Sequence, residues 1–135
     1  MKLSAHYGAE SLAALGAEAV DLLTKREIKV LGDRFNYMLA YGRPVDVAIQ
    51  DDLSRCVAVL GATSIVAAGE RPLPKVRFFN PDSGSLLALV ECLAPTDRAG
   101  SAVLVELVVI RSGSDDHLYL EDLSPVNETG VVPRP

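Results

Sequence analysis

Two glutamates lie within the most apolar part of the chain, and they are the side chains best suited to acid–base chemistry. Glu91 belongs to the apolar segment 86–93 and Glu106 to the apolar segment 102–110. Two carboxylates held a few ångströms apart in apolar surroundings raise the pKa of one of them, as a general acid or base requires. The pair therefore suggests a small-molecule pocket with weak acid–base chemistry.

The register between these two segments decides whether the glutamates meet. If the segments are neighbouring strands with Leu93 opposite Ala102, or in any pairing of the same parity, Glu91 and Glu106 share a face at about 5–8 Å. A pairing of the opposite parity places them on opposite faces, and the pocket hypothesis fails. In the alternative interpretation the glutamates face solvent or pair with a basic side chain such as Lys75.

A second cluster of polar side chains lies near the C-terminus. Asp115 and His117 could share a metal ion, but two ligands make a weak site. In a strand, His117 and Glu121 are about 13 Å apart and cannot bind the same ion. Leucines alternate with the polar residues here, so we expect His117, Tyr119 and Glu121 to lie on an open face or edge and to contact a partner protein.

An aromatic cluster lies near the end of a predicted helix. Tyr37 and Tyr41 are one helical turn apart, and Arg43 follows them. Tyrosine and arginine are enriched where protein interfaces gain most of their binding energy. We therefore include these three residues in a candidate binding surface, with the alternative that the tyrosines cover the seam between a helix and a sheet.

The charge of the chain bears on its partners. The net charge is −5, and residues 112–135 contain five acidic side chains and one basic one. Nucleic acids and anionic membranes repel such a surface, so neither is expected as a partner, whereas a basic protein would be attracted. Glycine-rich phosphate-binding motifs are absent from the sequence, and we expect no cofactor.

Cysteine content and hydropathy indicate the compartment. Cys56 and Cys92 are 36 positions apart among apolar neighbours, which favours buried, reduced thiols. Glu10 and Glu18 interrupt the apolar residues near the N-terminus, so a signal peptide is not expected. With no apolar run long enough to span a membrane, the sequence favours a cytoplasmic protein.

Hydrophobic periodicity predicts helices in the first half of the chain. Steps of three and four residues indicate a helix over 9–23 and a second over 28–39, which Gly42 ends. Thr24 and Glu27 have the spacing of a capping box for this second helix. The segment 45–60 is ambiguous between a hairpin and a third helix, and we favour the helix because Pro44 and Gly61 fit its two ends.

The second half of the chain alternates with a period of two and contains turn residues at short intervals. Predicted strands cover 63–67, 75–79, 86–93, 102–110 and 117–123. Short connections make neighbouring strands antiparallel. The fold class is therefore α+β, with two or three N-terminal helices packed on a four- to five-stranded antiparallel meander. Residues 1–124 form one domain, and 125–135 form a C-terminal tail.

These features favour a non-catalytic protein over an enzyme. We expect a small acidic interaction domain, similar to an adaptor or an inhibitor, that binds another protein through an exposed strand edge. The alternative is the pocket protein with Glu91 and Glu106. Strands as apolar as 102–110 require cover on both faces, so we also expect a homodimer.

Overall fold

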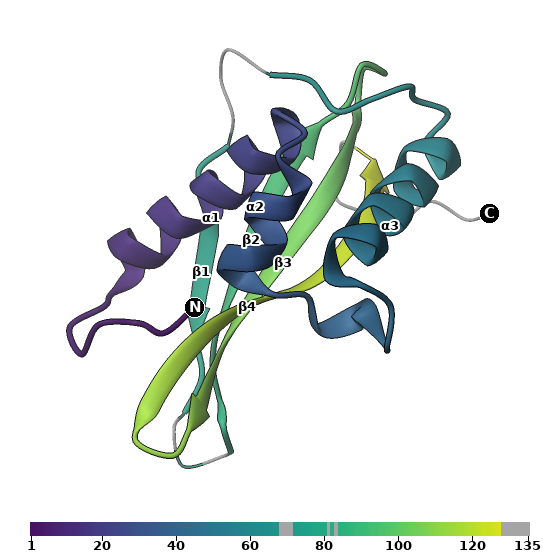
Figure 1. Ribbon diagram of the computed structural model, residues 1–135. Helices are drawn as coiled ribbons and strands as arrows, with labels where there is room; N and C mark the ends of the chain where they lie inside the picture. Colours follow the sequence, from purple (N-terminus) through teal and green to yellow (C-terminus); the bar gives the residue numbers. More distant parts are fainter. Residues whose placement is uncertain (68–71, 81, 83, 128–135) are drawn as a thin grey trace.

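Three α-helices precede a four-stranded sheet in the part of the chain that the structure describes, which is residues 1–67, 72–80, 82 and 84–127 of a computed structural model (Figure 1). The helical elements are α1 (Ala9–Thr24), α2 (Ile28–Phe35), the short 3₁₀ helix η1 (Met38–Ala40) and α3 (Val45–Val59). The strands are β1 (Lys75–Phe78), β2 (Leu86–Pro95), β3 (Ser101–Ser112) and β4 (Asp115–Asn127). Their order in the antiparallel sheet is β1-β2-β3-β4. The predicted α+β class and the meander are confirmed.

The helices lie together on one face of the sheet (Figure 1). Leu12, Ala19 and Leu23 of α1 are completely buried, and their spacing places them on one side of the helix. Gly16 lies on the same side, where a Cβ atom would be 2.6 Å from Cys92 Sγ on β2. The missing side chain therefore allows α1 to lie close against the strand.

The second helix ends earlier than predicted. It stops at Phe35, and Asn36 has a φ of 61°, outside the helical region. The next residue, Tyr37, forms an isolated parallel bridge with Leu120 of β4, and its N–H donates to Asn36 Oδ1. The chain thus leaves the helix because Tyr37 joins the edge of the sheet, a long-range contact that helical periodicity does not report.

The predicted capping box before α2 is wrong. Thr24 is the last residue of α1, and its hydroxyl donates to the carbonyl oxygen of Val20, so it does not cap α2. The third helix is confirmed for the ambiguous segment. It begins after Pro44 and ends before Gly61, whose φ of 67° is the left-handed conformation common after a helix.

The strands are longer than predicted at most ends. β4 continues through Pro125 and Val126 to Asn127, so part of the predicted C-terminal tail lies in the sheet, and 128–135 lie outside the described residues. The predicted strand 63–67 is wrong, since Ile65 forms a single bridge with Thr96. Residues 70 and 71 of the predicted connection 70–74, and residues 81 and 83 of the predicted turn 80–84, also fall outside the described residues. No described helix is long and apolar enough to cross a membrane.

Candidate functional site: the open face and free edge of the sheet

The face of the sheet opposite the helices is here called the open face. Its members follow from the register and alternation of the strands. They include Lys75 and Arg77 on β1, Leu89, Glu91, Leu93 and Pro95 on β2, Ala102, Leu104, Glu106, Val108 and Ile110 on β3, and His117, Tyr119, Asp122, Ser124 and Val126 on β4. Aliphatic side chains surround a central band of charge.

The central band is a row of side chains that crosses all four strands. Lys75 pairs with Glu91, Glu91 with Glu106, and Glu106 with Asp122. The sequence left the register of the two glutamates open, and the structure decides it: Leu93 lies opposite Leu104, a pairing of the parity that places both glutamates on one face. Glu91 and Glu106 are therefore direct neighbours.

Burial and the neighbouring carboxylates change the pKa of Glu106. Burial raises the pKa of its carboxyl, and the negative charges of Asp122, Glu121 and Glu91 raise it further. The pKa of Glu121 is also raised, by burial and by Asp122. Glu106 and Glu121 therefore hold their protons more tightly than separate surface carboxylates do.

Asp122 joins the row because β4 contains a bulge. Between Glu106 and Leu107 the register shifts, so Glu106 pairs with Asp122 whereas Leu107 pairs with Leu120, and Glu121 becomes the extra residue. The sequence places Asp122 in the C-terminal acidic cluster but not beside Glu91 and Glu106. A signal was present, since the buried leucines change from even to odd positions between Leu120 and Leu123.

A hollow beside Glu91 does not extend to Glu106. It lies on the open face and has a volume of about 230 Å³. Its other lining residues are Pro72, Leu73, Lys75, Leu93, Leu104 and Val126. Glu106 is not among the lining residues. Ligand sites usually have volumes of about 300–1,000 Å³, so the hollow is small for a substrate.

The other predicted residues of β4 lie at two different places. His117 and Tyr119 share the open face, and their rings stack with centroids 6.0 Å apart. Glu121 occupies the bulge. Asp115 forms an ion pair with Lys2 at 3.6 Å, and no three histidine, cysteine or acidic side chains in the described ranges are grouped so as to hold a metal.

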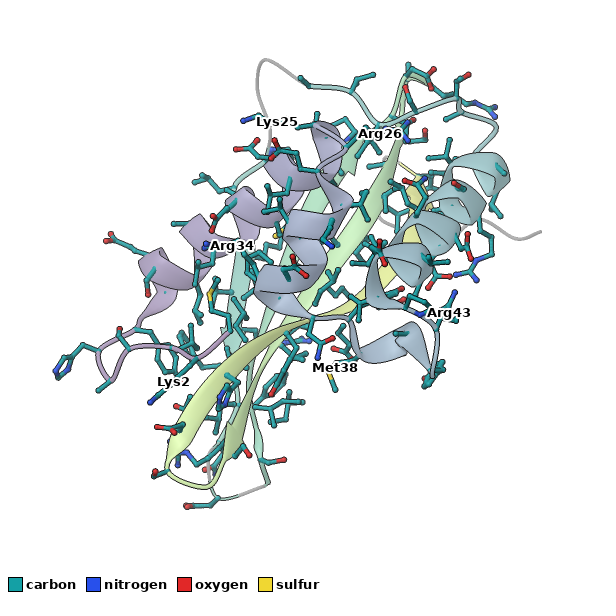
Figure 2. All side chains as sticks on the ribbon, in the orientation of Figure 1. Lys2, Lys25, Arg26, Arg34, Met38 and Arg43 are labelled. Carbon is teal, nitrogen blue, oxygen red and sulfur yellow. The ribbon has the colours of Figure 1, made fainter. Side chains whose placement is uncertain are left out.

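Tyr37 and Arg43 meet at a buried carboxylate. The Tyr37 hydroxyl donates to Asp52 Oδ2 at 2.6 Å, and Arg43 donates to both Asp52 oxygens at 3.1 and 3.2 Å. Arg43 lies where the chain enters α3 (Figure 2) and also donates to the carbonyl oxygens of Leu39 and Ala40. Together these bonds tie η1 to α3.

The two acidic groups of this network titrate far from neutrality. Burial would raise the pKa of Asp52, but hydrogen bonds from Arg43 and Tyr37 outweigh it and hold the pKa below its ordinary value. Burial and the hydrogen bond to Asp52 raise the pKa of Tyr37. Neither group is suited to exchange protons near neutral pH, so the arrangement stabilises the fold.

The expectation that Tyr37 and Tyr41 share one face of a helix is wrong. The helix ends before both residues, and their backbone conformations differ, since Tyr37 is extended and Tyr41 is left-handed. Tyr37 is 3% exposed and faces the interior, whereas Tyr41 is 81% exposed and has a φ of 49°. Tyr41 is thus the member of this pair whose ring is open to a partner.

The outer edge of β1 is the second feature of this region. The Phe79 N–H donates to the Leu87 carbonyl oxygen, which makes this a hydrogen-bonded antiparallel pair. Since backbone groups of alternate residues point to opposite sides, Val76 and Phe78 direct their N–H and C=O groups away from β2. Within the described part of the chain, β1 pairs with β2 alone.

An apolar groove of about 500 Å³ adjoins this edge. It runs between α1 and the start of β1, which lie beside each other (Figure 1). Its lining comes from four alanines and one glutamate of α1 and from the chain that leads into and enters β1, namely Ala9, Glu10, Ala13, Ala14, Ala17, Leu73, Pro74 and Val76. Leu73 is 86% exposed, an unusual degree for a leucine.

The cysteines are not part of either feature. Cys56 and Cys92 are buried and unpaired. Burial raises the pKa of the Cys56 thiol to about 11 and that of the Cys92 thiol to about 12. Both thiols therefore stay protonated at neutral pH and pack as small apolar groups.

Comparisons of the chain with protein-family models, with curated proteins and with solved structures found no match.

Proposed function

We propose that this domain is a non-catalytic interaction module that binds an extended segment of another protein along the edge of β1. The observation that carries the proposal is the apolar groove beside the outward-directed backbone groups of Val76 and Phe78. Extended peptides dock on such an edge by adding a strand, with affinity from main-chain hydrogen bonds and specificity from side-chain pockets.

The surroundings of the edge define the chemistry of the ligand. Alternate side chains of an added strand lie on opposite faces of the sheet. On the helix side they meet the apolar groove next to α1, and on the other side they lie beside Lys75 and Arg77 of β1. Because opposite charges on neighbouring strands attract, the ligand alternates apolar and acidic residues.

This ligand differs from the basic partner that the net charge suggests. The net charge of −5 belongs to the whole chain, whereas an added strand feels chiefly the side chains next to it. The nearest charged side chains on β1 are basic, and the acidic row begins one strand further away, at Glu91. The local charges therefore support an acidic ligand at this edge.

Fluorescence anisotropy with two labelled ten-residue peptides tests the proposal. One peptide alternates valine and glutamate, and the other alternates valine and lysine. We expect the first to bind at least about tenfold more tightly, since its charges complement Lys75 and Arg77. Equal or weaker binding of the acidic peptide would contradict the proposed ligand chemistry.

The substitution Val76→Pro tests the binding mode. Proline removes an outward N–H but leaves the hydrogen bonds between β1 and β2, because Val76 does not donate to β2. We expect peptide binding to weaken about tenfold or more, while Val76→Thr, which keeps the N–H, serves as the matched control. Unchanged binding by a folded Val76→Pro protein would rule out strand addition.

The alternative function is a small-molecule pocket that uses Glu91 and Glu106. One observation supports it, because the two carboxylates are neighbours and a hollow of about 230 Å³ lies beside Glu91. The small volume and the position of Glu106 outside the hollow make this support weaker than that for the edge of β1.

A further inference from the structure

We propose that a second copy of this chain covers the open face, with the two-fold axis parallel to the strands and between β2 and β3. This surface shares Lys75 and Arg77 with the edge of β1 but extends across all four strands, and its argument does not rest on the proposed peptide binding. The reasons are the area of the face, its aliphatic content and a charge pattern that complements itself under this rotation.

The area of the open face suits an isologous interface. Strands about 4.8 Å apart, with about 3.3 Å per residue, give the three long strands and the short β1 a projected area of about 620 Å². Two such faces together bury about 1,240 Å², above the roughly 1,000 Å² expected of a specific interface. Aligned sheets pack face to face in this way in β-sandwiches.

The charge pattern selects the direction of the axis. A two-fold rotation about an axis parallel to the strands leaves the position of each residue along the strand direction unchanged. It reverses the order of the strands, so that β1 lies over β4 of the partner subunit and β2 over its β3. It places Lys75 over Asp122 of the partner subunit, and Arg77 over the partner's Tyr119. Opposite charges meet in the first contact, and a cation meets an aromatic ring in the second.

The aliphatic residues complement each other under the same rotation. Leu93 comes to lie over Leu104 of the partner subunit, and Leu89 over the partner's Val108, which its own subunit already buries. An axis along the rows would instead place Lys75 over its own copy and Asp122 over its own copy, so that like charges meet. The strand-parallel axis is therefore favoured by both the charged and the apolar residues.

One contact opposes association and makes it depend on pH. Glu91 comes to lie over Glu106 of the partner subunit, which adds further carboxylates to the acidic row. Glu106 already faces Glu91 on β2 and Glu121 and Asp122 on β4, and these charges with burial raise its pKa. Association that needs Glu106 protonated takes up protons, so the dimer is more stable at low pH.

Sedimentation of the full chain over a range of concentrations, with charge-swapped variants, tests the arrangement. We expect Lys75→Glu and Asp122→Lys each to raise the dimer Kd at least about tenfold, because each brings like charges together at both symmetric contacts. The double variant restores the Kd to within about threefold of the original protein. Lys29→Glu, an exposed position on α2, is the matched control and leaves the Kd unchanged.

The double variant separates an interface effect from damage to the monomer. The double variant still contains both substituted side chains, one beside Glu91 and the other beside Glu106, so any disturbance within each subunit is still present. Recovery of the Kd can therefore arise only from contacts between subunits. Circular dichroism checks that each protein is folded. Failure of the folded double variant to recover would overturn the proposed axis.

A pH series tests the acidic contact. We expect the Kd to be at least about tenfold lower at pH 5.5 than at pH 8, and Glu106→Gln to remove most of this difference. Glu27→Gln, an exposed carboxylate at the start of α2, controls for the general loss of negative charge. Equal pH dependence in both variants would show that the contact between Glu91 and the partner's Glu106 does not form.

Two outcomes would reject the open face as an interface. One is a 14.4 kDa monomer at 200 µM at both pH values. The other is a dimer that Val76→Pro dissociates but Lys75→Glu does not, which would indicate pairing of two β1 edges. If the dimer forms as proposed, Val76→Pro leaves it intact whether or not the acidic peptide binds.

Discussion

Replacing Tyr37 by phenylalanine isolates one hydrogen bond in the interior of the protein. The Tyr37 hydroxyl donates to Asp52 at 2.6 Å, and the two residues are 3% and 4% exposed. Phenylalanine keeps the ring in place but removes the donor. Asp52 then keeps its bonds to Arg43 and an ion pair with Arg55 at 3.6 Å.

The expected loss of stability follows from the nature of this bond. A hydrogen bond to a charged group contributes about 1.5–3 kcal/mol, and Arg43 still compensates part of the carboxylate charge, so we expect the free energy of unfolding to fall by about 2 kcal/mol. With an unfolding entropy of about 2.1 cal/mol/K per residue, the 135-residue chain should lose about 7 °C in Tm.

Urea unfolding followed by circular dichroism measures this change at low protein concentration. Tyr41→Phe is the matched control, because Tyr41 is 81% exposed and the same substitution there should change the free energy of unfolding by less than about 0.5 kcal/mol. If the two variants are equally stable at pH 7, the bond between Tyr37 and Asp52 does not stabilise the fold as argued.

The pH dependence gives a second check. The pKa of Asp52 lies below its ordinary value in the folded protein, so its ionised form stabilises the fold above the unfolded pKa of about 3.8. This stability disappears as the pH falls through the folded pKa. The difference between Tyr37→Phe and the original protein should therefore decrease towards pH 2. A difference that stays constant would contradict the role of the charged carboxylate.

Two further predictions concern the contact between α1 and the sheet and the acidic row. Gly16→Ala should destabilise the protein by about 1–3 kcal/mol in urea unfolding, despite the higher helix propensity of alanine, because its Cβ would meet Cys92 Sγ at 2.6 Å. Gly8→Ala has open space and is the control; equal stability of the two variants would mean that α1 can move away from β2 at little cost. Glu106 has a raised pKa in the folded state, so its ionisation lowers stability as the pH rises above about 4.5 through the folded pKa. Glu106→Gln should therefore gain stability relative to the original monomer between pH 4 and pH 8 in dilute solution, and no relative gain would mean that Glu106 ionises as freely in the folded chain as in the unfolded one.

Local sequence patterns were sufficient to predict most of the helices and strands. The steps of three and four residues from Leu12 to Leu22 correspond to α1, and the residues flanking the ambiguous segment correctly favoured a helix there. Where the prediction failed, a distant contact decided the outcome. The second helix ends at Phe35 because Tyr37 forms a bridge with Leu120 of β4. No pattern in the residues near Tyr37 predicts this contact.

The candidate site was predictable in part. The sequence showed that one of two possible parities makes Glu91 and Glu106 neighbours, but only the register between β2 and β3 decided which parity occurs. Asp122 was not expected beside them, because it reaches the same row only through the bulge in β4. The binding surface predicted around Tyr37 and Tyr41 depended on a helix that ends too early, so these residues face different environments.

The sequence by itself determined the α+β class, the order of helices before strands and the antiparallel meander. Each of these depends on periodicity and on short connections, which are properties of neighbouring residues. Only the tertiary structure decided that Asp52 holds Tyr37 and Arg43, that three carboxylates form one row, and that a groove lies beside the edge of β1. Such features depend on register, a bulge and the packing of α1, and all three are set by contacts between residues far apart in the chain.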